Sequence, residues 1–197
     1  MSRAWALCAV VLLAACSSRP PDEGTYVEKV AADRAAKDAT FRGQALPIPV
    51  EAHGRFLPLA YFPIDPAFAV PASFTEDPPA ARRRMQMQTS AHQPREMERL
   101  GTLNFVLQGQ PLHLAAFREV GEAADALFVP FTDQTTGQQT YAAGRYLEIA
   151  RSPSGVYVVD FNKAFNPYCY YNSTYDCPYP PKENRLPVAI RAGERTK

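Results

Sequence analysis

A set of polar side chains in the C-terminal half of the chain has the types and spacing for ligand binding or acid–base chemistry. The set holds one arginine, two carboxylates and three amides: Arg145, Asp160, Asn162, Asn166, Glu183 and Asn184. An arginine beside carboxylates and amides can bind an anionic ligand or hold a general base. In a purely structural network, Arg145 would instead pair with Asp160, and the asparagines would bind the backbone of proline-rich loops. A network fills its own space, whereas an enzyme needs a cleft, so the sequence leaves both alternatives open.

A second kind of chemistry belongs to Cys16, which ends the run Leu13-Ala14-Ala15-Cys16. This run has the form of a bacterial lipobox, and it follows Arg3 and an apolar stretch over residues 4–15, the layout of a cleavable secretory signal. The stretch has 12 residues, whereas a membrane-spanning helix needs about 20. The sequence therefore predicts removal of residues 1–15 and acylation of Cys16 with diacylglycerol and palmitate, which would anchor the chain stably to a membrane.

This anchor predicts both a location and a domain organisation. Ser17 follows the cysteine, and a residue other than aspartate at this position is typical of transport to the outer membrane in bacteria with two membranes. We therefore expect an outer-membrane lipoprotein whose domain faces the periplasm. Residues 16–22 form the lipidated cysteine and tether, and residues 23–197 remain as a single globular domain, because the 182 residues left after cleavage suit one core.

After lipidation of Cys16, Cys169 and Cys177 are the only thiols in the mature chain. In an oxidising compartment a disulfide between them is the default, and closing so short a loop would stabilise the fold by roughly 2.5 kcal/mol. A catalytic or metal-binding thiol is the alternative. The surrounding tyrosines can stack on a sugar or an apolar ligand, or cover a proline-rich loop: Tyr168, Tyr170, Tyr171, Tyr175 and Tyr179.

Composition and missing motifs exclude several other classes of protein. A formal net charge of +1 makes no electrostatic case for binding nucleic acid. His53, His92 and His113 are the only histidines, and they form no HxH or HExxH pair that would hold zinc. The chain has no GxSxG nucleophile elbow and no Walker or GxGxxG loop. We therefore expect no metal, no cofactor and no nucleic-acid partner.

The elements that must position these residues are one helix and several short strands. A capping box followed by apolar residues at helical spacing predicts a helix over residues 26–41. Alternating apolar residues and turn signals predict strands over residues 56–62, 85–89, 103–107, 112–116, 127–131, 140–150, 156–161 and 186–190. With 19 prolines, this order favours a mainly β fold, an antiparallel sandwich or barrel-like sheet with one N-terminal helix and a long C-terminal loop rich in proline and tyrosine.

Two of these strands, on either side of residues 152–155, are expected to pair as a hairpin. In that register Arg145 lies opposite Asn162 and contacts Asp160 at the rim of the core. The loop that the two cysteines close would then bring two further residues to the same cluster: Glu183 and Asn184.

The C-terminal half also carries an ordered series of short motifs: Tyr141-Ala142-Ala143-Gly144-Arg145-Tyr146-Leu147, Asp160-Phe161-Asn162, Asn166-Pro167-Tyr168-Cys169, Cys177-Pro178 and Pro180-Pro181-Lys182-Glu183-Asn184. This series resembles the domain of unknown function 1684 family of bacterial and archaeal proteins. The resemblance extends over most of the mature chain, and Phe131-Thr132-Asp133 and the early helix also fit it. The family name implies no activity, so the resemblance groups the fold and supplies no mechanism.

From the sequence we therefore predict a lipid-anchored cell-envelope domain that binds a ligand or serves as a scaffold, with the membrane as its one defined partner. The alternative is a small hydrolytic enzyme of the envelope with a polar site around Arg145, Asp160, Asn162 and Glu183. A structure separates the two by showing whether these side chains line a cleft.

Overall fold

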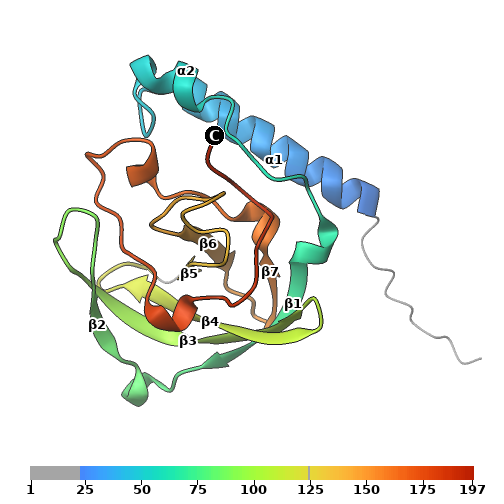
Figure 1. Ribbon diagram of the computed structural model, residues 1–197. Coiled ribbons are helices and arrows are strands. Elements are labelled where there is room, and N and C mark those ends of the chain that lie inside the picture. Colours follow the sequence, from blue (N-terminus) through green and yellow to red (C-terminus); the bar gives the residue numbers. More distant parts are fainter. Residues whose placement is uncertain (1–22, 124) are drawn as a thin grey trace, which may run out of the picture.

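The computed structural model describes residues 23–123 and 125–197 (Figure 1). The predicted signal and tether, residues 1–22, lie outside the described residues. The fold is mainly β, as predicted. It contains a long helix α1 (Glu23–Gly43), a short helix α2 (His53–Phe56) and one antiparallel sheet of β1 (Ala69–Glu76), β2 (Arg84–Met87), β3 (Arg95–Leu107), β4 (Gln110–Glu119), β5 (Ala126–Phe131), β6 (Arg145–Ala150) and β7 (Val156–Asp160). No helix among the described residues is long and apolar enough to cross a membrane.

The seven strands form a single curled sheet in the order β6-β5-β4-β3-β1-β7, and β2 pairs with β3 outside this path. The sheet curls into a half-barrel, and its two end strands, β6 and β7, approach each other without pairing (Figure 1). The predicted hairpin between β3 and β4 is confirmed. Gln108 and Gly109 at its tip both have positive φ, the conformation that matches a two-residue turn to the twist of the strands.

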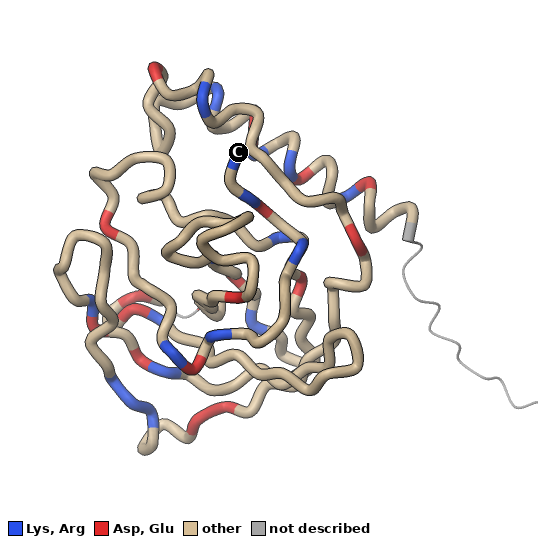
Figure 2. Tube along the Cα trace, in the orientation of Figure 1, with Lys and Arg blue, Asp and Glu red and all other residues tan. Residues whose placement is uncertain are grey.

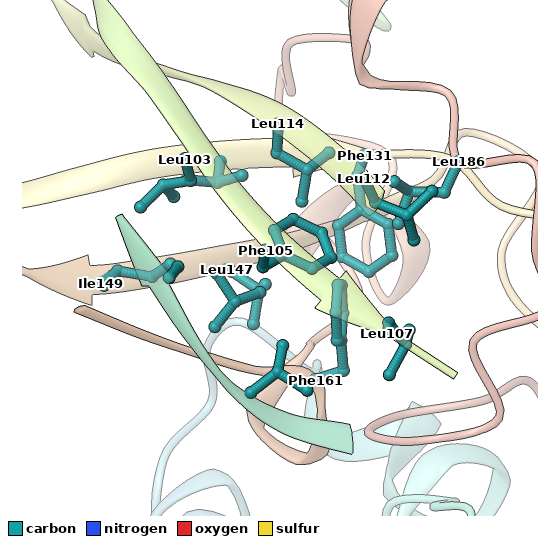
Figure 3. Close-up of a cluster of buried hydrophobic side chains, with 14 of the residues drawn as sticks. Leu103, Phe105, Leu107, Leu112, Leu114, Phe131, Leu147, Ile149, Phe161 and Leu186 are labelled. Atoms are coloured by element: carbon teal, nitrogen blue, oxygen red, sulfur yellow. The ribbon is translucent and has the colours of Figure 1, made fainter. Parts of the chain in front are cut away.

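The inside of the curl is the hydrophobic core. Alternate residues of each strand point into it, among them Leu103, Phe105 and Leu114, which are almost fully buried (Figure 3). Phe161 lies edge-on to both Phe105 and Phe131, with ring centroids 5.8 and 5.4 Å apart. The apolar alternation seen in the sequence therefore corresponds to the inner face of the sheet.

The C-terminal segment closes the open side of this curl. Leu186, Val188, Ile190 and Ala192 alternate along it and are all buried in the core. The prediction of a strand over residues 186–190 was nevertheless wrong, because this stretch forms no named strand. Its backbone makes only isolated bonds to the chain after β5, from Leu186 to Thr132 and from Gln134 to Val188, and Arg145 donates to the carbonyls of Ile190 and Ala192.

The predicted hairpin across residues 152–155 was also wrong. β6 pairs with β5, where Leu147 lies opposite Val129, and β7 pairs with β1, where Asp160 lies opposite Ala69. The connection between β6 and β7 therefore passes from one end of the curled sheet to the other. Two adjacent strands in sequence can each find a better long-range partner, and the sequence pattern alone does not show which partner is chosen.

Other boundaries also differ from the prediction, and β3 begins at Arg95 instead of residue 103. Strand β6 begins at Arg145 instead of residue 140, because Gly144 turns the chain with a positive φ, and a Cβ there would lie 2.6 Å from the carbonyl oxygen of Phe131. The stretch 56–62 ends helix α2 and continues without forming a named strand. Strand β1 was not predicted, because Pro71 interrupts its pattern, and this proline precedes the stretch that pairs with β3.

Helix α1 is confirmed and extends slightly beyond the predicted range. It lies along the outside of the curled sheet (Figure 1) and buries Val30 and Phe41. Polar contacts hold much of its length. Arg34 donates to the carbonyls of Phe62 and Asn162, and Asp38 accepts from the backbone amide of Leu59. The helix is therefore fixed both to the segment that follows it, at Leu59 and Phe62, and to the turn after β7, at Asn162.

Candidate functional site

Arg145 is the most deeply buried charged residue of the predicted polar set, with 1% of its surface exposed. Its guanidinium donates to Asp133 Oδ2 at 3.0 Å and to the carbonyls of Ile190 and Glu194 at 2.8 and 3.0 Å, besides that of Ala192. Burial lowers the pKa of Arg145, and the adjacent Asp133 carboxylate opposes this shift. The guanidinium thus holds the C-terminal segment against the start of β6.

Asp160 has different partners from those predicted. Its Oδ1 accepts from the hydroxyl of Tyr26 at 2.8 Å and from the backbone amide of Asn162 at 3.0 Å, and no bond to Arg145 is present among the described residues. The side chain of Asn162 bonds Tyr26 and both backbone groups of Asp65. The predicted contact between Arg145 and Asp160 was therefore wrong, because their strands do not pair. This cluster instead attaches the start of α1 to the end of β7.

Glu194 forms a third buried cluster that the sequence did not reveal. Lys37 and the hydroxyl of Tyr171 each donate to its carboxylate at 2.6 Å, and the backbone amide of Asn166 donates at 2.8 Å. Gly193, just before it, has a positive φ, and a Cβ there would lie 2.5 Å from the carbonyl oxygen of Ala164. The carboxylate joins α1, the tyrosine-rich loop and the C-terminal segment.

The remaining predicted residues lie elsewhere. Asn184 is fully buried and bonds both backbone groups of Ala115 and the carbonyl of Pro130, which bridges β4 and β5 where they diverge. Glu183 points outward and pairs with Arg99 at 3.3 Å. The prediction that both approach Arg145 was therefore wrong. The polar set does not converge on a cleft, and the fold uses its members to join separate segments.

Cys169 and Cys177 lie side by side as free thiols, and the backbone amide of Cys169 donates to the Cys177 sulfur at 3.2 Å. A hydrogen bond from the Cys177 thiol, opposed by burial, lowers the pKa of Cys169 to about 7. The same bond and burial raise the pKa of Cys177. The two residues are thus positioned next to each other, and the disulfide between them stays a prediction.

A candidate binding groove lies on the outer face of the sheet, where β4, β5 and β6 meet the tyrosine-rich loop. It has a volume of about 720 Å³. Its floor is a row of register partners across three strands, Phe117, Phe128 and Glu148. The loop forms the opposite wall with Tyr168 and Tyr175, whose ring centroids are 5.3 Å apart. We call this feature the aromatic groove.

The electrostatics of the aromatic groove favour positive charge. Three basic side chains line it, and each already pairs with a carboxylate: Lys37 with Glu194, Arg95 with Glu119, and Arg118 with Glu98. By contrast, three lining carboxylates have no ion pair among the described residues: Glu122, Asp125 and Glu148. Glu148 lies close enough to Tyr168 to help burial raise the pKa of that tyrosine.

Sequence reasoning identified part of this groove. The tyrosine-rich segment was predicted to stack on a ligand or to cover a loop, and Tyr168 lines the groove with 43% of its surface exposed. Glu148 was not singled out. The signal for it was the alternation within β6, which places Leu147 and Ile149 in the core and Glu148 on the outer face.

The fold defines this chain as a mainly β domain: a curled antiparallel sheet that is covered by one long helix and closed by its own C-terminal segment. The family model described as a protein of unknown function (DUF1684) matches residues 54–195, and the chain belongs to this family. The resemblance seen in the motifs of the C-terminal half is thereby confirmed.

The chain is also similar to an uncharacterised protein of Haloarcula marismortui whose structure was solved by NMR in solution. The two are 37% identical, with a TM-score of 0.69, and the match covers 89% of this chain and 96% of that one. No curated protein matches the chain. The comparisons therefore support the fold and the family and leave the activity to be argued from the site.

Proposed function

We propose that this protein is a lipid-anchored binding domain of the cell envelope and that the aromatic groove is its ligand site. The observation that carries the proposal is the row of Phe128 and Glu148 on the floor of the groove, facing Tyr168 on the wall. Exposed aromatic side chains gathered in a hollow mark an interaction site, and an exposed carboxylate without an ion partner is free to pair with a cationic ligand.

The chemistry of the groove selects a ligand with a positive charge on an apolar or flat body. Ring faces attract cations within about 6 Å of the centroid, and an adjacent carboxylate adds direct attraction. The basic residues of the groove do not oppose this, because their charges are already neutralised by carboxylates. An organic ammonium group on an apolar body is therefore the expected ligand class.

Binding is tested by calorimetry with benzyltrimethylammonium as the cationic probe and benzoate as its anionic counterpart. We expect benzoate to bind at least about tenfold more weakly, a difference of about 1.4 kcal/mol. Tyr168→Leu should weaken binding of the cation. Tyr179→Leu, which removes a similarly exposed tyrosine that does not line the groove, should leave it unchanged. Equal affinity for the two probes would refute the proposed ligand class.

The lipid anchor is supported by the lipobox that ends at Cys16 and by the apolar stretch before it. Expressed in a bacterium with an envelope, the full chain should partition into the detergent phase, and Cys16→Ala should abolish this partitioning. Recovery of the unchanged chain as wholly soluble periplasmic protein would contradict the anchor and would leave the groove to be judged by its own binding experiment.

A further inference from the structure

The outer face of β7, β1, β3 and β4 carries an exposed apolar row. Val158 lies opposite Pro71, and Val106 lies opposite Pro111. The β1–β3 register, continued by one residue beyond Ala72, places Pro71 beside Val106. Val106 and Val158 are 59% and 52% exposed, and Val156 on the same face is 66% exposed. We call Val156, Val158, Pro71, Val106 and Pro111 the valine row.

Charged residues are missing from the strand segments that carry this row. Residues 66–75, 100–117 and 152–159 contain no aspartate, glutamate, lysine or arginine. Figure 2 shows the turn end of the hairpin between β3 and β4 in tan, whereas charged residues gather at its other end near β2 and along α1. Along a strand of an antiparallel sheet, the residues that face the core are normally apolar and those that face outward are normally polar. Large exposed apolar residues without charges on such a face mark an interaction surface.

The first described residues of the chain, at the start of α1, lie near one end of this face. The hydroxyl of Tyr26, in the first turn of α1, donates to Asp160 at the end of β7, two residues beyond Val158. Cys16 lies seven residues before Glu23, the first residue of α1. Fully extended, seven residues reach at most about 25 Å. A lipid on Cys16 therefore keeps this end of the sheet close to the bilayer.

We infer that the valine row rests on the bilayer in which the lipid of Cys16 is inserted, an inference that depends on the proposed anchor. Uncharged apolar side chains can enter the interface without desolvating a charge, and the tether holds them at high effective concentration. The tyrosine-rich loop lies on the side of the molecule away from the start of α1 (Figure 1), so this orientation leaves the aromatic groove facing the periplasm.

Tryptophan fluorescence tests this orientation, because the only tryptophan of the sequence, Trp5, lies in the predicted signal. The full chain is expressed in a bacterium, purified with its lipid and reconstituted into phosphatidylethanolamine–phosphatidylglycerol vesicles containing brominated acyl chains. Val106→Trp and Val158→Trp each place a single tryptophan in the valine row of the mature chain. Val50→Trp is the matched control, since Val50 is 63% exposed and lies beyond the far end of α1.

We expect brominated lipid to quench the two variants of the row and to leave Val50→Trp unchanged. Flotation of the same samples separates the possible failures. Vesicles that float with the protein but quench none of the variants, or all three equally, would overturn the inference and leave the anchor standing. Protein that does not float would overturn both.

Discussion

The buried network around Arg145 and the aromatic groove use polar residues in opposite ways. Arg145 donates four hydrogen bonds and is 1% exposed, so its guanidinium stabilises the fold and is not accessible to a ligand. Glu148 lies on an outer strand face, beside exposed rings, with no ion pair among the described residues. The comparison teaches that a rich set of partners marks a structural residue, and that an unpartnered charge beside a hollow marks a residue available to a ligand.

The largest expected effect is on stability, from a change in the buried network around Arg145. Arg145→Met removes the guanidinium that pairs with Asp133 Oδ2 and serves three backbone carbonyls, and it leaves the Asp133 carboxylate buried without its ion partner. We therefore expect a loss of about 3–5 kcal/mol in the free energy of unfolding. Arg151→Met is the control, because Arg151 is partly exposed and pairs with an exposed Glu76. It should cost less than about 1 kcal/mol. Urea unfolding measures both, and similar losses would break the comparison.

A second effect concerns the loop that forms one wall of the groove. We expect Cys169 and Cys177 to form a disulfide in protein folded in the periplasm and to add roughly 2.5 kcal/mol to its stability. Mass spectrometry of unreduced protein should show the two residues linked, and reductant should lower the unfolding midpoint of the parent chain but not of Cys177→Ser. Free thiols that react with an alkylating agent in periplasmic material would count against the bond.

A smaller effect is expected at Glu148, and it should fall on binding and not on stability. Glu148→Gln keeps the shape and removes the charge, so the free energy of unfolding should stay within about 0.5 kcal/mol. Binding of benzyltrimethylammonium should weaken about fivefold, or about 1 kcal/mol. Glu51→Gln, which neutralises an exposed carboxylate that does not line the groove, is the control. Equal effects of both changes would assign the loss to overall charge.

A last effect, confined to the reduced protein, is a pH dependence. The hydrogen bond from Cys177 lowers the pKa of Cys169 from an ordinary value of 9.0 to about 7. Folding therefore favours the Cys169 thiolate, and its contribution to stability is present above the unfolded pKa and is lost as the pH falls through about 7. Alkylation of Cys169 should level off just above pH 7, well before that of Cys177, and equal pH profiles for the two thiols would contradict the assignment.

Local patterns in the sequence predicted the elements whose partners lie nearby. The helix α1 and the β3–β4 hairpin depend on neighbouring residues, and both were predicted. The partners of β6 and β7 depend on how the whole sheet curls, which no local pattern records. Burial of Arg145 followed from the apolar face of its strand. Its acceptors did not, because backbone carbonyls of an irregular segment have no signature in the sequence.

The same distinction explains how much of the groove was predictable. The cluster of tyrosines was visible in the sequence, and Tyr168 and Tyr175 do line the groove. The floor was not visible, because Phe117, Phe128 and Glu148 become neighbours only through pairing of β4, β5 and β6. Read alone, Phe128 and Glu148 are ordinary outward positions on a strand, and Phe117 is a fully buried core residue.

The central claim is that ligand binds at the aromatic groove and not at the buried network. The most direct test is a titration of the isotope-labelled mature protein with benzyltrimethylammonium, followed by the backbone amide signals in NMR. We expect the largest shifts at Phe128, Glu148 and Tyr168, and little change at Arg145 and Asp133. Shifts centred on Arg145 and Asp133, with the groove unaffected, would contradict the account.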